Sequence, residues 1–241
     1  FLANRSGNDE TPPIAGGNRD VPAAAPGDNN PQPAVPPELP PAAFLPPVPQ
    51  CSAGETELFF DDFEDGNLNG WDLSDVNGQP STNGWSVTQQ GNNHVLAGQG
   101  HNWAVAQATF GQDYVLHLRV RQGAAANWHL NVRMGENGRY YVSPESLHRD
   151  PDTIELARWP GQPDDAWHII SIMAKGNHLE VFWDGRQVAA ADDPEPLKAG
   201  VVALENTGGA VWYDDIRVCA LPAAGPAADA PAPPSAQLHF V

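Results

Sequence analysis

The middle of the chain alternates apolar and polar residues with a period of two, and this pattern constrains the fold most strongly. In the segment Tyr114–Arg121, Leu116, Leu118 and Val120 share one parity, while His and Arg residues fall on the other. Such alternation gives a strand one apolar face and one solvated face, as in an antiparallel sheet. No segment has the pattern of a helix of ten residues or more. The chain is therefore predicted to be all-β.

Turn signals separate the predicted strands. Gly176-Asn177 and Asp184-Gly185 are two-residue turns, because these residue types accept positive φ. Many short strands with turns at this spacing predict a two-sheet sandwich or a barrel. The predicted strands are Glu57–Asp61, Trp85–Gln89, His94–Ala97, Trp103–Phe110, Tyr114–Arg121, Trp128–Met134, Arg139–Val142, Thr153–Arg158, Trp167–Lys175, His178–Asp184, Gln187–Ala190, Gly200–Glu205 and Ala210–Val218.

The prolines divide the chain into three parts. Of the 25 prolines, 13 lie between Thr11 and Gln50, and five more follow Cys219. Proline has no N–H donor and fixes φ near −65°, so these segments are expected to be extended rather than helical. We predict a Pro-rich arm at 1–50, a folded domain at 51–219 and an Ala- and Pro-rich arm at 220–241.

Two cysteines, Cys51 and Cys219, lie at the two edges of the predicted domain. Their placement suggests a disulfide that joins the first and last strands; two free thiols are the alternative. Disulfides persist in oxidising compartments. We therefore expect an extracellular, cell-surface or periplasmic protein.

Charge excludes two classes of partner. The formal net charge is −18, and the chain has only two lysines. An acidic chain repels nucleic acid and anionic lipid, so neither is expected as a partner. No apolar run approaches the roughly 20 residues that span a bilayer, so membrane insertion is not expected either.

The first and last predicted strands resemble those of concanavalin A-like, laminin G-like jelly-roll domains, a class that includes carbohydrate-binding modules. The resemblance implies an antiparallel two-sheet jelly roll over about residues 57–218. Its motifs are structural and occur in lectins, binding modules and some glycosidases, so they imply the fold more than the function. The matching segments are 59–66 (Phe-Phe-Asp-Asp-Phe-Glu-Asp-Gly), 70–71, 84–87, 167–170, 179–185 and 211–218.

Four aspartates are candidates for a calcium site. Val211 and Tyr213 have one parity and Ile216 and Val218 the other, which predicts a β-bulge between them. If the first and last strands pair, four carboxylates meet there and need a cation, protons or water to relieve their repulsion. Family members often hold a structural Ca²⁺ between their terminal strands; solvated carboxylates are the alternative. The candidate metal ligands are Asp61, Asp62, Asp214 and Asp215.

The polar parity of three strands gives a candidate ligand face. In jelly rolls of the resembling family, the polar face of the concave sheet often receives glycans. Sugars need aromatic platforms together with amide, carboxylate or guanidinium groups; an ordinary solvated face is the alternative. Trp103 and Trp159, beside loops, are further aromatic candidates. The predicted ligand-binding residues are Arg119, Asn127, His129, Arg133, Tyr140, Tyr141, Glu180 and Phe182.

We find no catalytic motif. The Glu-x-Asp-x-x-Glu run of jelly-roll glycosidases, the Gly-x-Ser-x-Gly elbow and the His-Glu-x-x-His pair are absent from the sequence. The first hypothesis is therefore a non-catalytic glycan-binding or adhesive module. The second is a structural subunit of a surface assembly or filament, whose arms at 1–50 and 220–241 contact neighbouring subunits. A glycoside-acting hydrolase ranks last.

Overall fold

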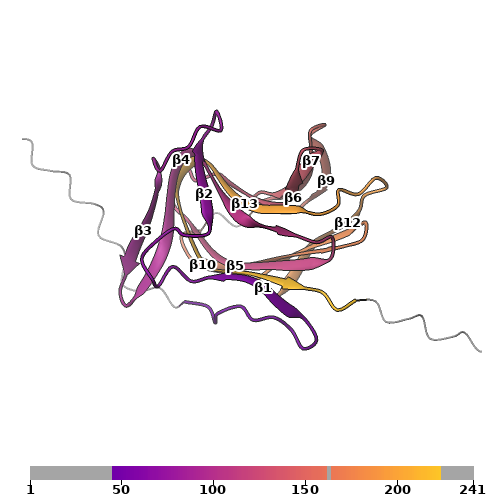
Figure 1. Cartoon of the computed structure of the whole chain (residues 1–241), viewed down its shortest axis with the longest axis horizontal. Coiled ribbons are helices and arrows are strands. Elements are labelled where there is room, and N and C mark those ends of the chain that lie inside the picture. The colour runs from indigo at the N-terminus through magenta and orange to yellow at the C-terminus, as the bar shows by residue number, and fades with distance from the viewer. Residues whose placement is uncertain (1–44, 162–163, 224–241) are drawn as a thin grey trace, which may run out of the picture. The chain divides into compact units, whose positions relative to one another are not determined.

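The computed structural model describes residues 45–161 and 164–223, which form one continuous antiparallel sheet of 13 strands. The sheet curves nearly into a barrel (Figure 1), and these residues contain no helix, so the all-β prediction is confirmed. No helix in this part of the chain could cross a membrane. The strands are β1 (Thr56–Asp61), β2 (Trp71–Asp75), β3 (Trp85–Gln90), β4 (Asn93–Phe110), β5 (Tyr114–Gln122), β6 (Trp128–Gly135), β7 (Gly138–Val142), β8 (Ser146–Asp150), β9 (Ile154–Arg158), β10 (Trp167–Lys175), β11 (His178–Trp183), β12 (Arg186–Asp192) and β13 (Gly200–Ala220).

Strand β13 is shared by both halves of the fold. Its first half pairs with β6 and its second half with β5, while its other edge pairs with β4 and then β1. The pairing of the first and last strands is therefore as predicted. Between the halves, Gly209 approaches the β5–β6 loop so closely that an added Cβ would lie 2.4 Å from the Ala124 carbonyl oxygen. A residue with a side chain would not fit at this position.

The sheet folds over into two layers (Figure 1). We call β2, β4, β6, β7, β8 and β9, with the first half of β13, the upper layer. The lower layer comprises β1, β5, β10, β11 and β12, with the second half of β13. In the upper layer, β2 and the β7–β9 strands rise on opposite sides of β13 and β6, so the outer face of this layer is concave.

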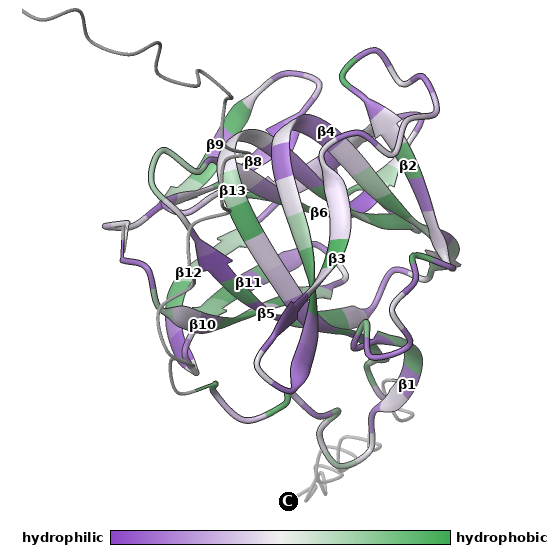
Figure 2. Ribbon diagram, turned by 90° about the vertical axis from the view of Figure 1, so that its left-hand side faces the viewer, coloured by the Kyte–Doolittle hydropathy of each residue, from purple (hydrophilic) through white to green (hydrophobic). Residues whose placement is uncertain are grey.

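The core lies between the layers and follows the predicted parity. Coloured by hydropathy, most strands carry both hydrophobic and hydrophilic positions (Figure 2). Leu118, Leu130 and Val181 are fully buried, and the Trp128 and Trp183 rings stack with centroids 6.3 Å apart. Burying such large apolar side chains is the main favourable term in the stability of a sheet sandwich.

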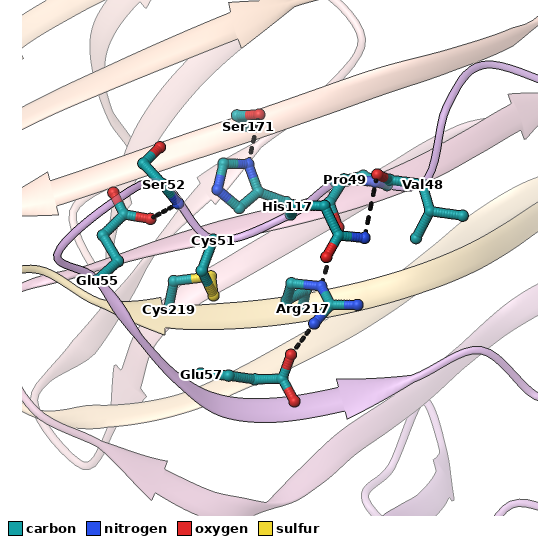
Figure 3. The surroundings of a disulfide bond; sticks show 11 residues. Val48, Pro49, Cys51, Ser52, Glu55, Glu57, His117, Ser171, Arg217 and Cys219 are labelled. Atoms are coloured by element: carbon teal, nitrogen blue, oxygen red, sulfur yellow. Dashed lines mark hydrogen bonds and ion pairs between the residues drawn. A yellow bond between two sulfur atoms is a disulfide. The ribbon is translucent and has the colours of Figure 1, made fainter.

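The disulfide between Cys51 and Cys219 is confirmed, with Cα atoms 5.6 Å apart (Figure 3). Residues 45–51 form an extended strap over the outer face of the lower layer. The Pro46 and Pro49 carbonyls of this strap accept hydrogen bonds from Arg119 Nη1 (3.2 Å) and Arg217 Nε (2.9 Å). The rest of the two predicted arms, 1–44 and 224–241, lies outside the described residues.

Some strand boundaries differ from the prediction. β2 and β8 were not expected, because the sequences Trp-Asp-Leu-Ser-Asp and Ser-Leu-His-Arg-Asp hold few apolar residues. β4 and β13 are each a single strand where two were expected. β-bulges interrupt both predicted halves of β13, and the chain continues through them without a turn.

Replacing both cysteines with serine should lower the free energy of unfolding by about 5 kcal/mol, because the disulfide closes a very long loop in the unfolded chain. The half-cystines are 168 residues apart in sequence. Urea unfolding of the oxidised wild type and of the double variant measures the difference. Equal stabilities would contradict the proposed constraint.

Candidate functional site

The predicted ligand residues do not share one face. His129 and Tyr141 lie on the outer face of the upper layer, on β6 and β7. Glu180 and Phe182 lie on β11 in the lower layer. Asn127 is exposed in the loop before β6.

Two arginines that were expected to face solvent are buried: Arg119 has the predicted outward direction but is covered, whereas the predicted direction of Arg133 is wrong. Arg119 on β5 is 4% exposed, because the strap covers it. Arg133 is 1% exposed and has a positive φ beside a register shift, which turns its side chain into the fold. Its guanidinium donates to three backbone carbonyls, those of residues 112, 176 and 197. Arg133 therefore connects the β4–β5, β10–β11 and β12–β13 loops, which is a structural role.

Tyr140 and Trp159 are also buried. The Tyr140 hydroxyl donates to Asp193 Oδ2 at 2.6 Å and accepts from the Leu197 amide. The indole of Trp159 donates to the Pro144 carbonyl. Of the adjacent tyrosines, Tyr141 is therefore the one on the outer face.

The predicted carboxylate cluster is partly assembled. The bulge lies where it was expected, between Asp214 and Arg217, and Asp61 pairs with Ile216. Arg119 forms ion pairs with both Asp214 and Asp215, so a guanidinium relieves part of the repulsion that suggested a cation. Calcium binding stays a prediction.

Few potential metal-ligating side chains lie close together in the described part of the chain. Among residues 45–161 and 164–223, one group of three His, Cys, Asp or Glu side chains brings its ligand atoms within 4.8 Å of one another. It consists of Cys51, Glu55 and Cys219, and both of its sulfurs belong to the disulfide.

A row of polar and aromatic side chains crosses the outer face of the upper layer. Strand register places Trp103 opposite Glu205, Glu205 opposite His129, and Tyr141 opposite His148. We call these residues, together with His101, Asn131 and Arg139, the outer row. They come from five neighbouring strands, namely β4, β13, β6, β7 and β8.

Glu205 lies at the centre of the outer row. Its side chain is 5% exposed and contacts His101 at 3.2 Å, His129 at 2.7 Å and Arg139 at 2.7 Å. Burial alone would raise the pKa of Glu205, but the His129 hydrogen bond and the Arg139 charge lower it below its usual value. The carboxylate is therefore ionised at neutral pH and fixes the groups around it.

Arg139 joins the aromatic members of the row. Its guanidinium carbon lies 4.8 Å from the Trp103 ring centre and 4.9 Å from that of Tyr141, within cation–π range. The Tyr141 ring in turn stacks on the His148 ring, with centroids 4.9 Å apart. Arg139 Nε also donates to Asp150 at 2.8 Å. These contacts hold long side chains in fixed positions before any ligand binds.

Three polar groups of the outer row have hydrogen-bonding capacity to spare. Within the described residues, no hydrogen bond engages Arg139 Nη2, His129 Nε2 or the Tyr141 hydroxyl. The His129 and Arg139 side chains are each 18% exposed, whereas Tyr141 is 9% exposed, so this surface is reached mainly through the first two. His101 is exposed as well. By contrast, three nitrogens of Arg133 are bonded to backbone carbonyls.

Five members of the row were not among the predicted ligand-binding residues: His101, Asn131, Arg139, His148 and Glu205. Each has the polar parity of its strand, which was the available signal. Their proximity depends on the strand order β4-β13-β6-β7-β8, in which β13 enters between strands far earlier in the chain.

Comparison with solved structures places the fold. The chain superimposes on a Bacillus subtilis protein of unknown function with a galectin-like fold (TM-score 0.57, 11% identity, 69% of this chain and 97% of that one). It also matches domain 4 of AbnA, an extracellular arabinanase from Geobacillus stearothermophilus solved with arabinotriose (0.54, 10%, 69% and 93%). The chain has the concanavalin A-like, galectin-like jelly-roll fold. The resemblance found in the sequence is thereby confirmed.

The jelly roll also occurs in enzymes. A family 16 endo-glucanase from Bacteroides ovatus matches with a TM-score of 0.52 and 12% identity, over 67% of this chain and 99% of that one. A family model described as a 3-keto-alpha-glucoside-1,2-lyase-like domain matches residues 151–219. A search of curated proteins by sequence finds no match.

The stability of the jelly roll should fall as pH rises from 5 to 8, and Asp214→Asn should weaken this dependence. Burial, opposed by a hydrogen bond from Asn93, raises the pKa of Asp214 from its usual value of 3.8 to about 7. Between pH 3.8 and pH 7 the folded state holds a proton that the unfolded state has released, so raising the pH from 5 to 8 lowers the free energy of unfolding by about 3 kcal/mol.

Urea unfolding at pH 5 and pH 8 checks this expectation. The exposed Asp152→Asn variant is the control and should keep the wild-type pH dependence. An unchanged dependence in the Asp214 variant would show that this carboxyl is ionised throughout the range.

Proposed function

We propose that the protein is a non-catalytic glycan-binding module and that the outer row is its binding surface. The observation that carries the proposal is the set of unused polar groups on Arg139 and His129, which are partly exposed, and on Tyr141, which is nearly buried beside them. The contacts that hold these three side chains leave one polar atom of each without a hydrogen bond among the described residues. Glycan sites combine such planar polar groups with aromatic surface, because sugars offer hydroxyls and apolar C–H faces.

The comparisons support the same class of ligand. The matching arabinanase domain was solved with arabinotriose, and the matching endo-glucanase acts on a glucan. Strand register places the outer row on the outer face of the upper layer, whereas the strap and its arginine contacts occupy part of the lower layer's outer face. The disulfide and the extracellular arabinanase support an extracellular location.

The charge arrangement favours binding over hydrolysis. Glycosidases need two carboxyl groups that act across the scissile bond. In the outer row, Glu205 is buried under His129 and Arg139, and the nearby Asp150 pairs with Arg139. Pairing with Arg139 holds both carboxylates, which favours a role in positioning the row over proton donation or nucleophilic attack. The assembly-subunit hypothesis rests on arms outside the described residues and stays a prediction.

His129→Ala and Trp103→Ala should each weaken binding at least tenfold, which corresponds to about 1.4 kcal/mol. Calorimetry or affinity electrophoresis with arabinan and mixed-linkage β-glucan measures the effect. Phe182→Ala, on the lower layer, is the matched control and should bind as the wild type does. Circular dichroism and melting temperature verify that each variant is folded.

Two outcomes would contradict the proposal. One is loss of binding in the Phe182 variant with retention in the His129 variant. The other is release of reducing ends from either polysaccharide by the wild type, which would show catalysis.

A further inference from the structure

The outer row extends beyond the size of one sugar. Ser74 on β2 pairs with Trp103, so the outward positions run from β2 across β4, β13, β6 and β7 to His148 on β8. Adjacent strands lie about 4.8 Å apart, so the row covers about 24 Å. That distance is several times the length of one pyranose or furanose ring.

Two hollows border this path and lie on opposite sides of the Trp103–Arg139 contact. The first has a volume of about 1000 Å³ and is lined by Ser74 and Val105, which both neighbour Trp103, and by the turn around Thr82. The second, of about 700 Å³, is lined by Arg139, Asp150 and the β6–β7 turn. Volumes of this size accommodate small ligands. A ligand on the row therefore has room to continue past Trp103 toward β2 and past Arg139 toward the β6–β7 turn.

The arginine in the row and the one on the next strand are both paired with carboxylates. Arg139 is paired with Asp150 and Glu205, and Arg158 on the neighbouring strand is paired with Glu145 and Glu155. No excess of positive charge remains to attract a polyanion, and the chain as a whole carries −18. The electrostatics favour an uncharged ligand.

We propose that the outer row binds an internal stretch of a neutral, extended polysaccharide, with the two hollows taking the units on either side of the Trp103–Arg139 contact. The inference rests on the proposed glycan-binding function and specifies the form of the ligand. A site for chain ends or single sugars would be closed at one side, whereas this path is open at both.

Calorimetry with α-1,5-arabino- and mixed-linkage β-gluco-oligosaccharides of two to six units tests the proposal. Affinity should rise at least tenfold from the disaccharide to the longest oligomers, and reducing the terminal sugar to its alditol should leave it unchanged. Polygalacturonate should bind more weakly than the neutral polymers.

Single variants test the two hollows. Thr82→Trp and Asn137→Trp, in the turns that border them, should each weaken binding of the hexasaccharide at least fivefold and spare the disaccharide. Asn177→Trp, in the exposed β10–β11 turn, is the control and should change neither.

The outcomes separate the two proposals. Equal affinity for short and long oligomers, loss of binding on end reduction, or preference for polygalacturonate would overturn the extended neutral ligand and leave glycan binding intact. Absence of binding to every oligomer and polymer would contradict the glycan-binding function itself.

Discussion

The hydrogen bonding of β13 to four strands is the constraint on which the rest of the structure depends. Because β13 passes from the upper layer to the lower, β5 and β6 both border it but on different halves. Arg119 and His129 therefore lie in different layers, although both flank the same strand. The disulfide and the strap close the lower layer, while the outer face of the upper layer stays accessible.

Burial determines which hydrogen-bond partners the guanidinium groups of three arginines have. Arg133 is enclosed and bonded to backbone carbonyls, and Arg119 is bonded to the strap and two aspartates. Their hydrogen bonds replace most of those that water would give, although Arg119 Nε has no partner among the described residues. Arg139 has the same chemistry, but its Nη2 has no hydrogen bond within the described residues, since Glu205, Asn131 and Asp150 use only its other two nitrogens.

The period of two predicted the core and part of the site. It placed Leu118 and Leu130 inside and His129 outside, because alternation within a strand is a local property. It failed at Arg133, where a positive φ reverses the side-chain direction. It also missed the meeting of Glu205 with His129, since register between distant strands depends on topology that a single sequence does not encode locally.

The central claim is that ligand binds on the outer face of the upper layer. Chemical-shift mapping tests it directly, with ¹⁵N-labelled protein titrated with the polysaccharide that binds. We expect shifts in the Trp103 indole and in the amides of His129 and Tyr141, with the Phe182 and Arg119 signals unchanged. Shifts centred on Phe182 or on the strap, with the outer row unchanged, would contradict it.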